Sequence, residues 1–148
     1  MPSELDLLAV RAEVELLNRA EGHRWRVRQA DDGLRVYVKL SPAKSPDEYC
    51  LRLDFGESLS SGPPSVTFCD PESLAEGSPR DWPANLTEFF KHPPGNGGGW
   101  ICNEWTREGR QHHAEWNRTW KTTRVVWRVV TAIQDILDKP GNYTGRNQ

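Results

Sequence analysis

One cysteine of this chain stands among residue types that support nucleophilic, acid–base and metal chemistry. Cys102 is the cysteine, and its neighbours in sequence of these types are His92, Glu104, His112 and His113. A cysteine thiolate is a strong nucleophile, and histidine and glutamate side chains accept protons. Cysteine and histidine are also zinc ligands. Free cysteines are commonly buried and inert, so spacing alone leaves nucleophile, zinc ligand and structural thiol open.

Zinc is the weaker of the two chemical interpretations. His112 and His113 are adjacent, which makes them a poor pair of ligands on one element, and the chain has no Cys-x-x-Cys or His-x-x-x-His motif. The glycine run that ends at Gly99 lacks the lysine of a phosphate-binding P-loop and does not lead from a strand into a helix. We therefore expect neither a metal ion nor a cofactor.

The composition narrows the classes of partner. The chain has 148 residues, 36% hydrophobic and 27% charged, with a net charge of -2 and a mean hydropathy of -0.75. Without a global basic field, nucleic acid is a disfavoured partner. No apolar run approaches the roughly 18–20 residues of a membrane span, and the N-terminus lacks a signal-peptide profile, so no membrane association is expected. Three cysteines do not form a disulfide framework, which predicts free thiols and a cytoplasmic location.

Hydrophobic periodicity predicts two helices and four strands. The first helix has a capping serine, Ser3, and an apolar stripe with helical spacing, while the strands alternate apolar and polar side chains. The second helix is predicted where valines and isoleucines recur with helical period before Pro140. The predicted ranges are helices at 3–20 and 113–137, strands at 24–29, 34–40, 48–55 and 65–68, and a polar tail at 142–148.

Consecutive strands with short links predict an antiparallel meander, and together with the helices this gives an α+β fold in one domain, 1–148. Residues 70–100 hold five prolines and are predicted to form a long functional loop anchored by aromatic side chains. Cys50 and Cys69 fall at strand positions and are expected to be structural thiols.

A family resemblance centres on residues 92–102. The stretch reads His-Pro-Pro-Gly-Asn-Gly-Gly-Gly-Trp-Ile-Cys, in which His92-Pro93 precedes Cys102 by ten residues and Gly-x-Ile-Cys ends the segment. In this it resembles the ubiquitin-conjugating enzyme (UBC) family, which has a His-Pro-Asn tripeptide at that distance. The segment 49–68, with its Pro-Pro turn, and the segment 120–137 are also similar to the matching parts of that family.

The resemblance implies a UBC-like fold and acyl transfer through sulfur. Cys102, on an accessible loop, would receive a ubiquitin-like modifier protein from an adenylating activating enzyme and hold it as a thioester. It would then pass the modifier to an amine of a target protein. His92 would order the active-site loop. The candidate proton acceptors are Glu104, His112 and His113.

Two features depart from the family pattern. Pro94 replaces the asparagine of the tripeptide, and the support of the oxyanion then falls to Asn96, Asn103 or the amides of residues 97–99. The spacing from Cys102 to Trp120, the tryptophan that begins the similar segment 120–137, is longer than in common eukaryotic members because the segment 103–119 lies between them. The pattern resembles a divergent, bacterial branch and indicates a bacterial modification pathway such as antiviral defence.

The resemblance also implies a docking surface, because Arg11, Glu15 and Arg19 lie where the family's first helix meets the activating enzyme. The lost asparagine leaves an alternative function, a non-catalytic UBC-like module that binds a ubiquitin-like protein without carrying it. A third hypothesis is a metal-dependent hydrolase that uses Cys102 and the histidines, for which bound zinc is required.

Overall fold

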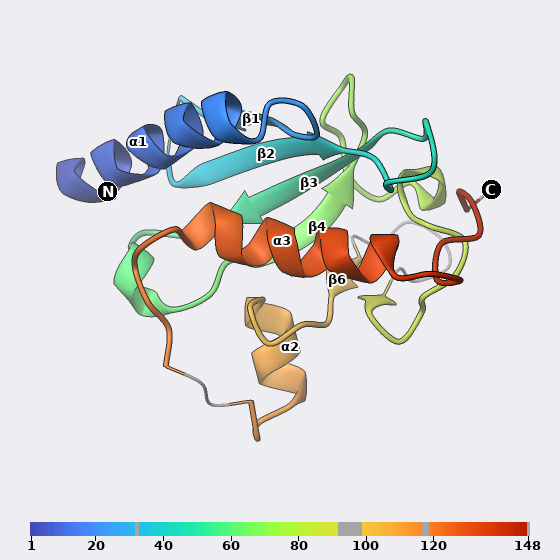
Figure 1. Cartoon of the computed structure of the whole chain (residues 1–148). Helices are drawn as coiled ribbons and strands as arrows, with labels where there is room; N and C mark the ends of the chain where they lie inside the picture. Colours follow the sequence, from blue (N-terminus) through green and yellow to red (C-terminus); the bar gives the residue numbers. More distant parts are fainter. Residues whose placement is uncertain (32, 92–98, 117–118, 148) are drawn as a thin grey trace.

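The computed structural model describes residues 1–31, 33–91, 99–116 and 119–147, and its framework is a four-stranded antiparallel sheet (Figure 1). The strand order is β1-β2-β3-β4, so neighbours in sequence are neighbours in the sheet. Each strand begins and ends within two residues of its predicted range, which confirms the α+β class and the meander. The strands are β1 (Arg26–Gln29), β2 (Arg35–Leu40), β3 (Tyr49–Asp54) and β4 (Ser65–Cys69).

Alternation along the strands decides which face of the sheet is buried. In β3, Leu53 has no exposed surface, whereas Arg52 and Asp54 on either side of it are partly exposed. Opposed residues of an antiparallel pair lie on the same side, and Leu53 is opposite Val36 in β2 and Val66 in β4. The apolar layer therefore crosses three strands on one face.

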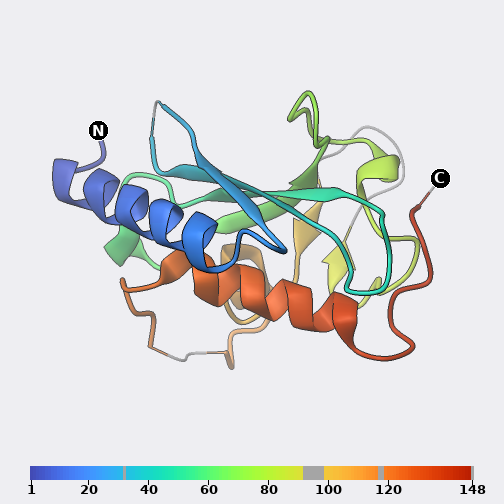
Figure 2. The ribbon, with the colours of Figure 1, turned by 45° about the horizontal axis from the view of Figure 1, so that its top comes forward.

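Two helices cover this apolar face, as Figures 1 and 2 show. α1 (Glu4–Ala20) is capped by Ser3 as predicted, and the Ser3 hydroxyl accepts the Asp6 N–H at 3.1 Å. α3 (Val125–Asp138) lies beside α1 and buries a stripe that includes Val126, Val129, Val130, Ile133 and Leu137. Within the described ranges, no helix combines the length and apolarity needed to cross a bilayer.

The prediction of a continuous helix over 113–137 is wrong in its first half. The described residues from His113 to Arg124 are not helical, and the chain instead forms a short α2 (Arg107–His112) before α3. The apolar period that predicted the helix exists only from Val125 onward. Before Val125, Trp120 is not part of a helix; its Nε1–H donates to the Leu59 carbonyl at 2.8 Å.

The N-terminus of α3 is capped by a side chain from α1. Arg124, which precedes α3, has a positive φ of 55° and offers no side-chain cap. Instead the two Glu13 carboxylate oxygens accept the N–H groups of Val126 and Trp127, each at 2.9 Å. Burial raises the pKa of Glu13, and these two hydrogen bonds oppose the shift. Glu13 thus ties α1 to α3.

The C-terminal segment is packed against the body of the protein, although its composition predicted only a polar tail. The Ala84 N–H donates to the Gly145 carbonyl at 2.8 Å, and the Asn147 N–H donates to the Trp82 carbonyl at 2.8 Å. These bonds make the described part of the tail a short strand-like partner of residues 82–84.

Candidate functional site

A short hairpin positions Cys102. β5 (Phe90–Lys91) pairs antiparallel with β6 (Trp100–Ile101). The Cys102 N–H donates to the Phe89 carbonyl at 2.6 Å, which extends the pairing by one residue. Figure 1 shows β6 below α3, at the β4 end of the sheet.

The two faces of this hairpin differ in character. Phe90 and Ile101, which are directly opposite, are 1% and 0% exposed and belong to the core. Because side chains alternate along a strand, Lys91, Trp100 and Cys102 lie on the other face. The thiol is therefore beside a cation and an indole rather than within the apolar core.

Cys102 is less accessible than the resemblance implied. Its exposed fraction is 3%, so the prediction of a thiol on the open surface of a loop is wrong. It nevertheless keeps a small exposed area, whereas Cys50 and Cys69 have none. Burial raises the pKa of the Cys102 thiol, and the positive charge of Lys91 opposes this shift. Little thiolate therefore exists at neutral pH without help from a proton acceptor.

Thr106 holds the turn that follows Cys102. Its side chain has no exposed surface, and its hydroxyl lies 2.5 Å from the Ile101 carbonyl oxygen, to which it donates. The same hydroxyl accepts the Gly109 N–H at 3.1 Å and so caps α2. One side chain thus joins the strand before the cysteine to the helix after it. Sequence reasoning missed Thr106, because a six-residue polar helix gives no periodic signal.

Two glycines allow close backbone packing on either side of Cys102. A Cβ on Gly99 would lie 2.3 Å from the Trp82 ring and 2.6 Å from the Lys91 carbonyl oxygen. A Cβ on Gly109 would lie 2.1 Å from the Asn103 carbonyl oxygen. Both distances are far below normal contact, so a side chain at either position would push the cysteine-bearing segment out of place.

α2 lies along the outer edge of β4, the last strand in the sheet order. The Arg107 N–H donates to the Pro64 carbonyl at 2.8 Å, and the Glu108 carboxylate accepts the Val66 N–H at 3.0 Å. The segment that lengthens the chain after Cys102 is therefore fastened to the main sheet.

Asn103 and Glu104 follow Cys102 directly and are partly buried. The Asn103 side-chain oxygen accepts the Trp105 N–H at 2.9 Å, which fixes the side chain within the turn. The donors that Asn103 can offer to an oxyanion are its side-chain N–H groups, because its backbone N–H already donates to the Thr106 hydroxyl at 3.3 Å. The backbone carbonyl of Glu104 accepts the Arg110 Nε–H at 2.7 Å.

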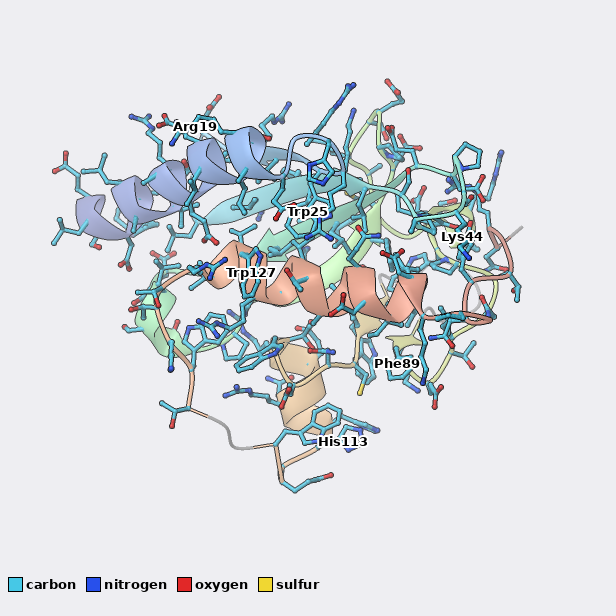
Figure 3. The ribbon with its side chains drawn as sticks, viewed as in Figure 1. Arg19, Trp25, Lys44, Phe89, His113 and Trp127 are labelled. Carbon is cyan, nitrogen blue, oxygen red and sulfur yellow. The ribbon has the colours of Figure 1, made fainter. Side chains whose placement is uncertain are left out.

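The two adjacent histidines have different surroundings. The His112 ring lies 5.5 Å from the Trp100 ring, whereas the His113 ring stacks on Trp116 at 4.0 Å. Figure 3 shows His113 at the lower tip of the protein, beyond α2. Because Trp100 shares a face with Cys102, His112 is connected to that face through its ring contact with Trp100.

The tripeptide positions His92 and Pro94 lie outside the described residues, as do Asn96, Gly97 and Gly98, which were candidates for oxyanion support. Among the residues that the structure does describe, no group of three or more histidine, cysteine, aspartate and glutamate side chains could hold a metal ion.

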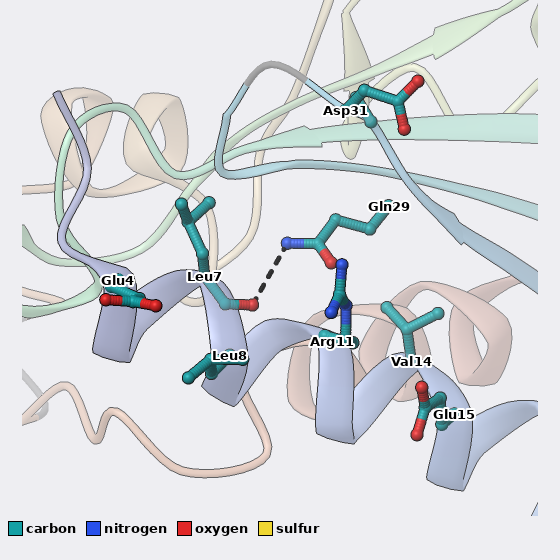
Figure 4. A pocket seen from close by; sticks show the side chains of 9 residues that line it. Glu4, Leu7, Leu8, Arg11, Val14, Glu15, Gln29 and Asp31 are labelled. Carbon is teal, nitrogen blue, oxygen red and sulfur yellow. Dashed lines mark hydrogen bonds between the residues drawn. The ribbon is translucent and has the colours of Figure 1, made fainter.

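The predicted docking residues Arg11, Glu15 and Arg19 are all exposed on α1. Arg11 and Glu15 line a depression of about 460 Å³ between α1 and the turn from β1 to β2, together with Leu8 and Asp31 (Figure 4). Arg19 lies outside it. The depression and Cys102 are at opposite ends of the sheet, since β1 and β4 are its outer strands.

No protein-family model, curated protein or solved structure matches this chain. Function must therefore be argued from the site, which combines the Cys102 thiol, the nearby charge of Lys91 and the turn that Thr106 holds.

Proposed function

We propose that the chain is a UBC-like conjugating enzyme that carries a ubiquitin-like protein as a thioester on Cys102. The observation that carries the proposal is the position of this thiol: it ends a strand, faces away from the core, and lies beside Lys91 and the α2 segment. It also follows a helix and a four-stranded meander, which is the order of elements that the resemblance implied.

The first step is the transfer of the modifier from one thiol to another. The Cys102 sulfur attacks the thioester carbon of the activated modifier, the new carbon–sulfur bond forms, and the thiol of the activating enzyme leaves with the proton that Cys102 gives up. Lys91 favours this step because its charge stabilises the attacking thiolate. The raised pKa of Cys102 favours retention of the acyl group, since thiols of lower pKa leave faster.

The second step is attack by an amine on the Cys102 thioester. A neutral amine forms the carbon–nitrogen bond, a tetrahedral oxyanion develops, and the carbon–sulfur bond then breaks. The amide N–H groups of Asn103 are suited to stabilise the oxyanion, because the turn already holds the side-chain oxygen. Among the candidate proton acceptors, His112 is favoured over His113 because it packs against Trp100.

The low exposure of Cys102 sets a condition on this chemistry. The C-terminal residues of a modifier can reach the sulfur only if the side chains that cover it move aside. The sulfur-bearing residue keeps 3% of its surface exposed, so we expect this movement to involve side chains on this face of the hairpin.

The test is a loading assay with an adenylating enzyme and a modifier encoded beside this chain. With ATP, the wild type should form an adduct that excess thiol cleaves. Cys102→Ser should form a thiol-resistant ester or no adduct, while Cys50→Ser, as a matched control, should load like the wild type. A verified activating enzyme and modifier that form no adduct with the wild type contradict the proposal.

One observation favours a second candidate function, a UBC-like module that binds a ubiquitin-like protein without carrying it. A thiol that is 3% exposed and has a raised pKa is typical of a structural cysteine. In that case the modifier should bind wild type and Cys102→Ala with equal affinity in titration calorimetry, and no thiol-labile adduct should form with either.

A further inference from the structure

Two cysteines lie apart from the candidate site, opposite each other on neighbouring strands. Cys50 of β3 is paired with Cys69 of β4 in the sheet register, and both are free thiols with no exposed surface. Since Leu51 faces the core, alternation places Cys50, and with it Cys69, on the outer face of the sheet. The pair is thus separated from the apolar core and from the hairpin that carries Cys102.

A row of cations leads to the pair across the same face. In the register, Arg26 of β1 is opposite Lys39 of β2, and Lys39 is opposite Cys50. A hollow of about 260 Å³ lies over this row, and its lining includes Arg26, Lys39, Cys50 and Leu74. Small solutes can enter this hollow, and they reach the Cys50 sulfur, which has no exposed surface, when the side chains over it move aside.

The backbone geometry at Cys50 and Cys69 permits a disulfide bond between them. Opposed residues of an antiparallel pair have Cα atoms about 4.5–5.5 Å apart, within the range of about 4.4–6.8 Å that disulfides span. A hydrogen bond from Cys69, helped by the charge of Lys39, lowers the pKa of Cys50, although burial opposes the shift. The hydrogen bond to Cys50 and burial raise the pKa of Cys69. Cys50 is the thiol of the pair that lies opposite Lys39 and lines the hollow, so we assign it the role of the attacking thiol.

We propose that Cys50 and Cys69 form a reversible thiol–disulfide site that hydroperoxides oxidise. The Cys50 thiolate attacks the peroxide, so that a sulfur–oxygen bond forms, the oxygen–oxygen bond breaks, and the leaving oxygen departs as water or alcohol. The Cys69 thiol then attacks the resulting sulfenic sulfur; the sulfur–sulfur bond forms and the sulfenic oxygen leaves as water with the proton of Cys69. Two electrons pass from the thiols to the peroxide, and a thiol reductant reverses the oxidation.

The test is oxidation of the folded chain with hydrogen peroxide, followed by thiol counting in denaturant. Two of the three thiols should be lost, peptide mass mapping should find Cys50 joined to Cys69, and dithiothreitol should restore all three. Cys102→Ala should still lose two thiols. Cys69→Ala should instead leave a sulfenic acid on Cys50 that dimedone traps. A link that forms only after unfolding in urea, or that joins either residue to Cys102, overturns the proposal.

A charge variant keeps the test informative if the cysteine variants do not fold. Lys39→Gln should slow disulfide formation several-fold, because the charge that favours the Cys50 thiolate is removed. Lys44→Gln, an exposed lysine in the loop between β2 and β3, should leave the rate unchanged. Equal rates in wild type and Lys39→Gln contradict the role of Cys50 as the attacking thiol.

Discussion

Replacement of Thr106 by valine should destabilise the turn that holds Cys102. Valine has nearly the same shape as threonine, so it leaves no cavity, but it removes the hydroxyl. The Gly109 N–H then loses its cap, which costs about 1 kcal/mol. The buried Ile101 carbonyl loses its donor, which costs a further ~1–3 kcal/mol. We expect the free energy of unfolding to fall by about 3 kcal/mol in total.

Thr106→Ser is the matched control, because serine keeps the hydroxyl and loses only a methyl group, at a cost of about 1 kcal/mol. Urea unfolding followed by tryptophan fluorescence measures both variants, since the chain has seven tryptophans. In the same samples, Cys102 should react faster with iodoacetamide in Thr106→Val than in Thr106→Ser, because the turn beside it is loosened. If the valine variant is as stable as the serine variant, the hydroxyl does not hold the turn and our reasoning is wrong.

Three further predictions concern the contacts around the two helices and the thiol. Glu13→Ala should destabilise the protein by about 1 kcal/mol, because α3 loses its cap. Because the native pKa of Glu13 is raised, the wild type should exceed Glu13→Ala in stability most at a pH below the ordinary carboxyl pKa. This difference in stability should decline as the pH rises through the native pKa of Glu13. Melting curves in which the difference grows with pH would refute this. Gly109→Ala should destabilise the protein by about 2 kcal/mol and Ala114→Gly, at an exposed position outside the helices, by much less; equal unfolding midpoints for the two variants would count against the close contact with Asn103. Alkylation of Cys102 should rise with pH to a midpoint above the ordinary thiol pKa of about 8.5, and Lys91→Gln should move the midpoint higher; an unchanged midpoint would exclude the role of that charge.

The main sheet and the first helix were predictable because their signals are local. Alternation in segments such as 35–40 specifies a strand with one buried face, and Ser3 with the apolar stripe specifies where α1 begins. These patterns need no knowledge of distant residues. The antiparallel order followed from the short connections between strands.

The boundaries of the later helices were not predictable because distant side chains decide them. α3 begins at Val125, where a carboxylate from α1 provides the cap, and no nearby residue signals this start. α2 is too short to show a period, and it depends on Thr106 and on contacts with β4. The sequence pattern therefore predicted a helix that begins 12 residues too early, at 113 instead of Val125, and missed α2 before it.

Some features of the candidate site were likewise predictable from local sequence, and others depended on distant contacts. The importance of Cys102 was predicted from its spacing to His92, but its exposure depends on how the hairpin of β5 and β6 packs, which spacing does not report. The alternation in β3 placed Cys50 on the outer face. Its pairing with Cys69 required the register across the connection 55–64, which includes a 3-10 turn at Leu59–Ser61.

The position of α2 has a consequence for how copies of this chain behave towards one another. An outer strand with unpaired N–H and C=O groups is a template on which a second molecule can add a strand. Here α2 lies along that edge, and its Arg107 and Glu108 bond to Pro64 and Val66 at the start of β4, so the helix hinders a second molecule from adding a strand there. A variant that lacks α2 would expose this edge of β4 and would be prone to form fibres or precipitate, even if Cys102 and its neighbours on the hairpin were intact.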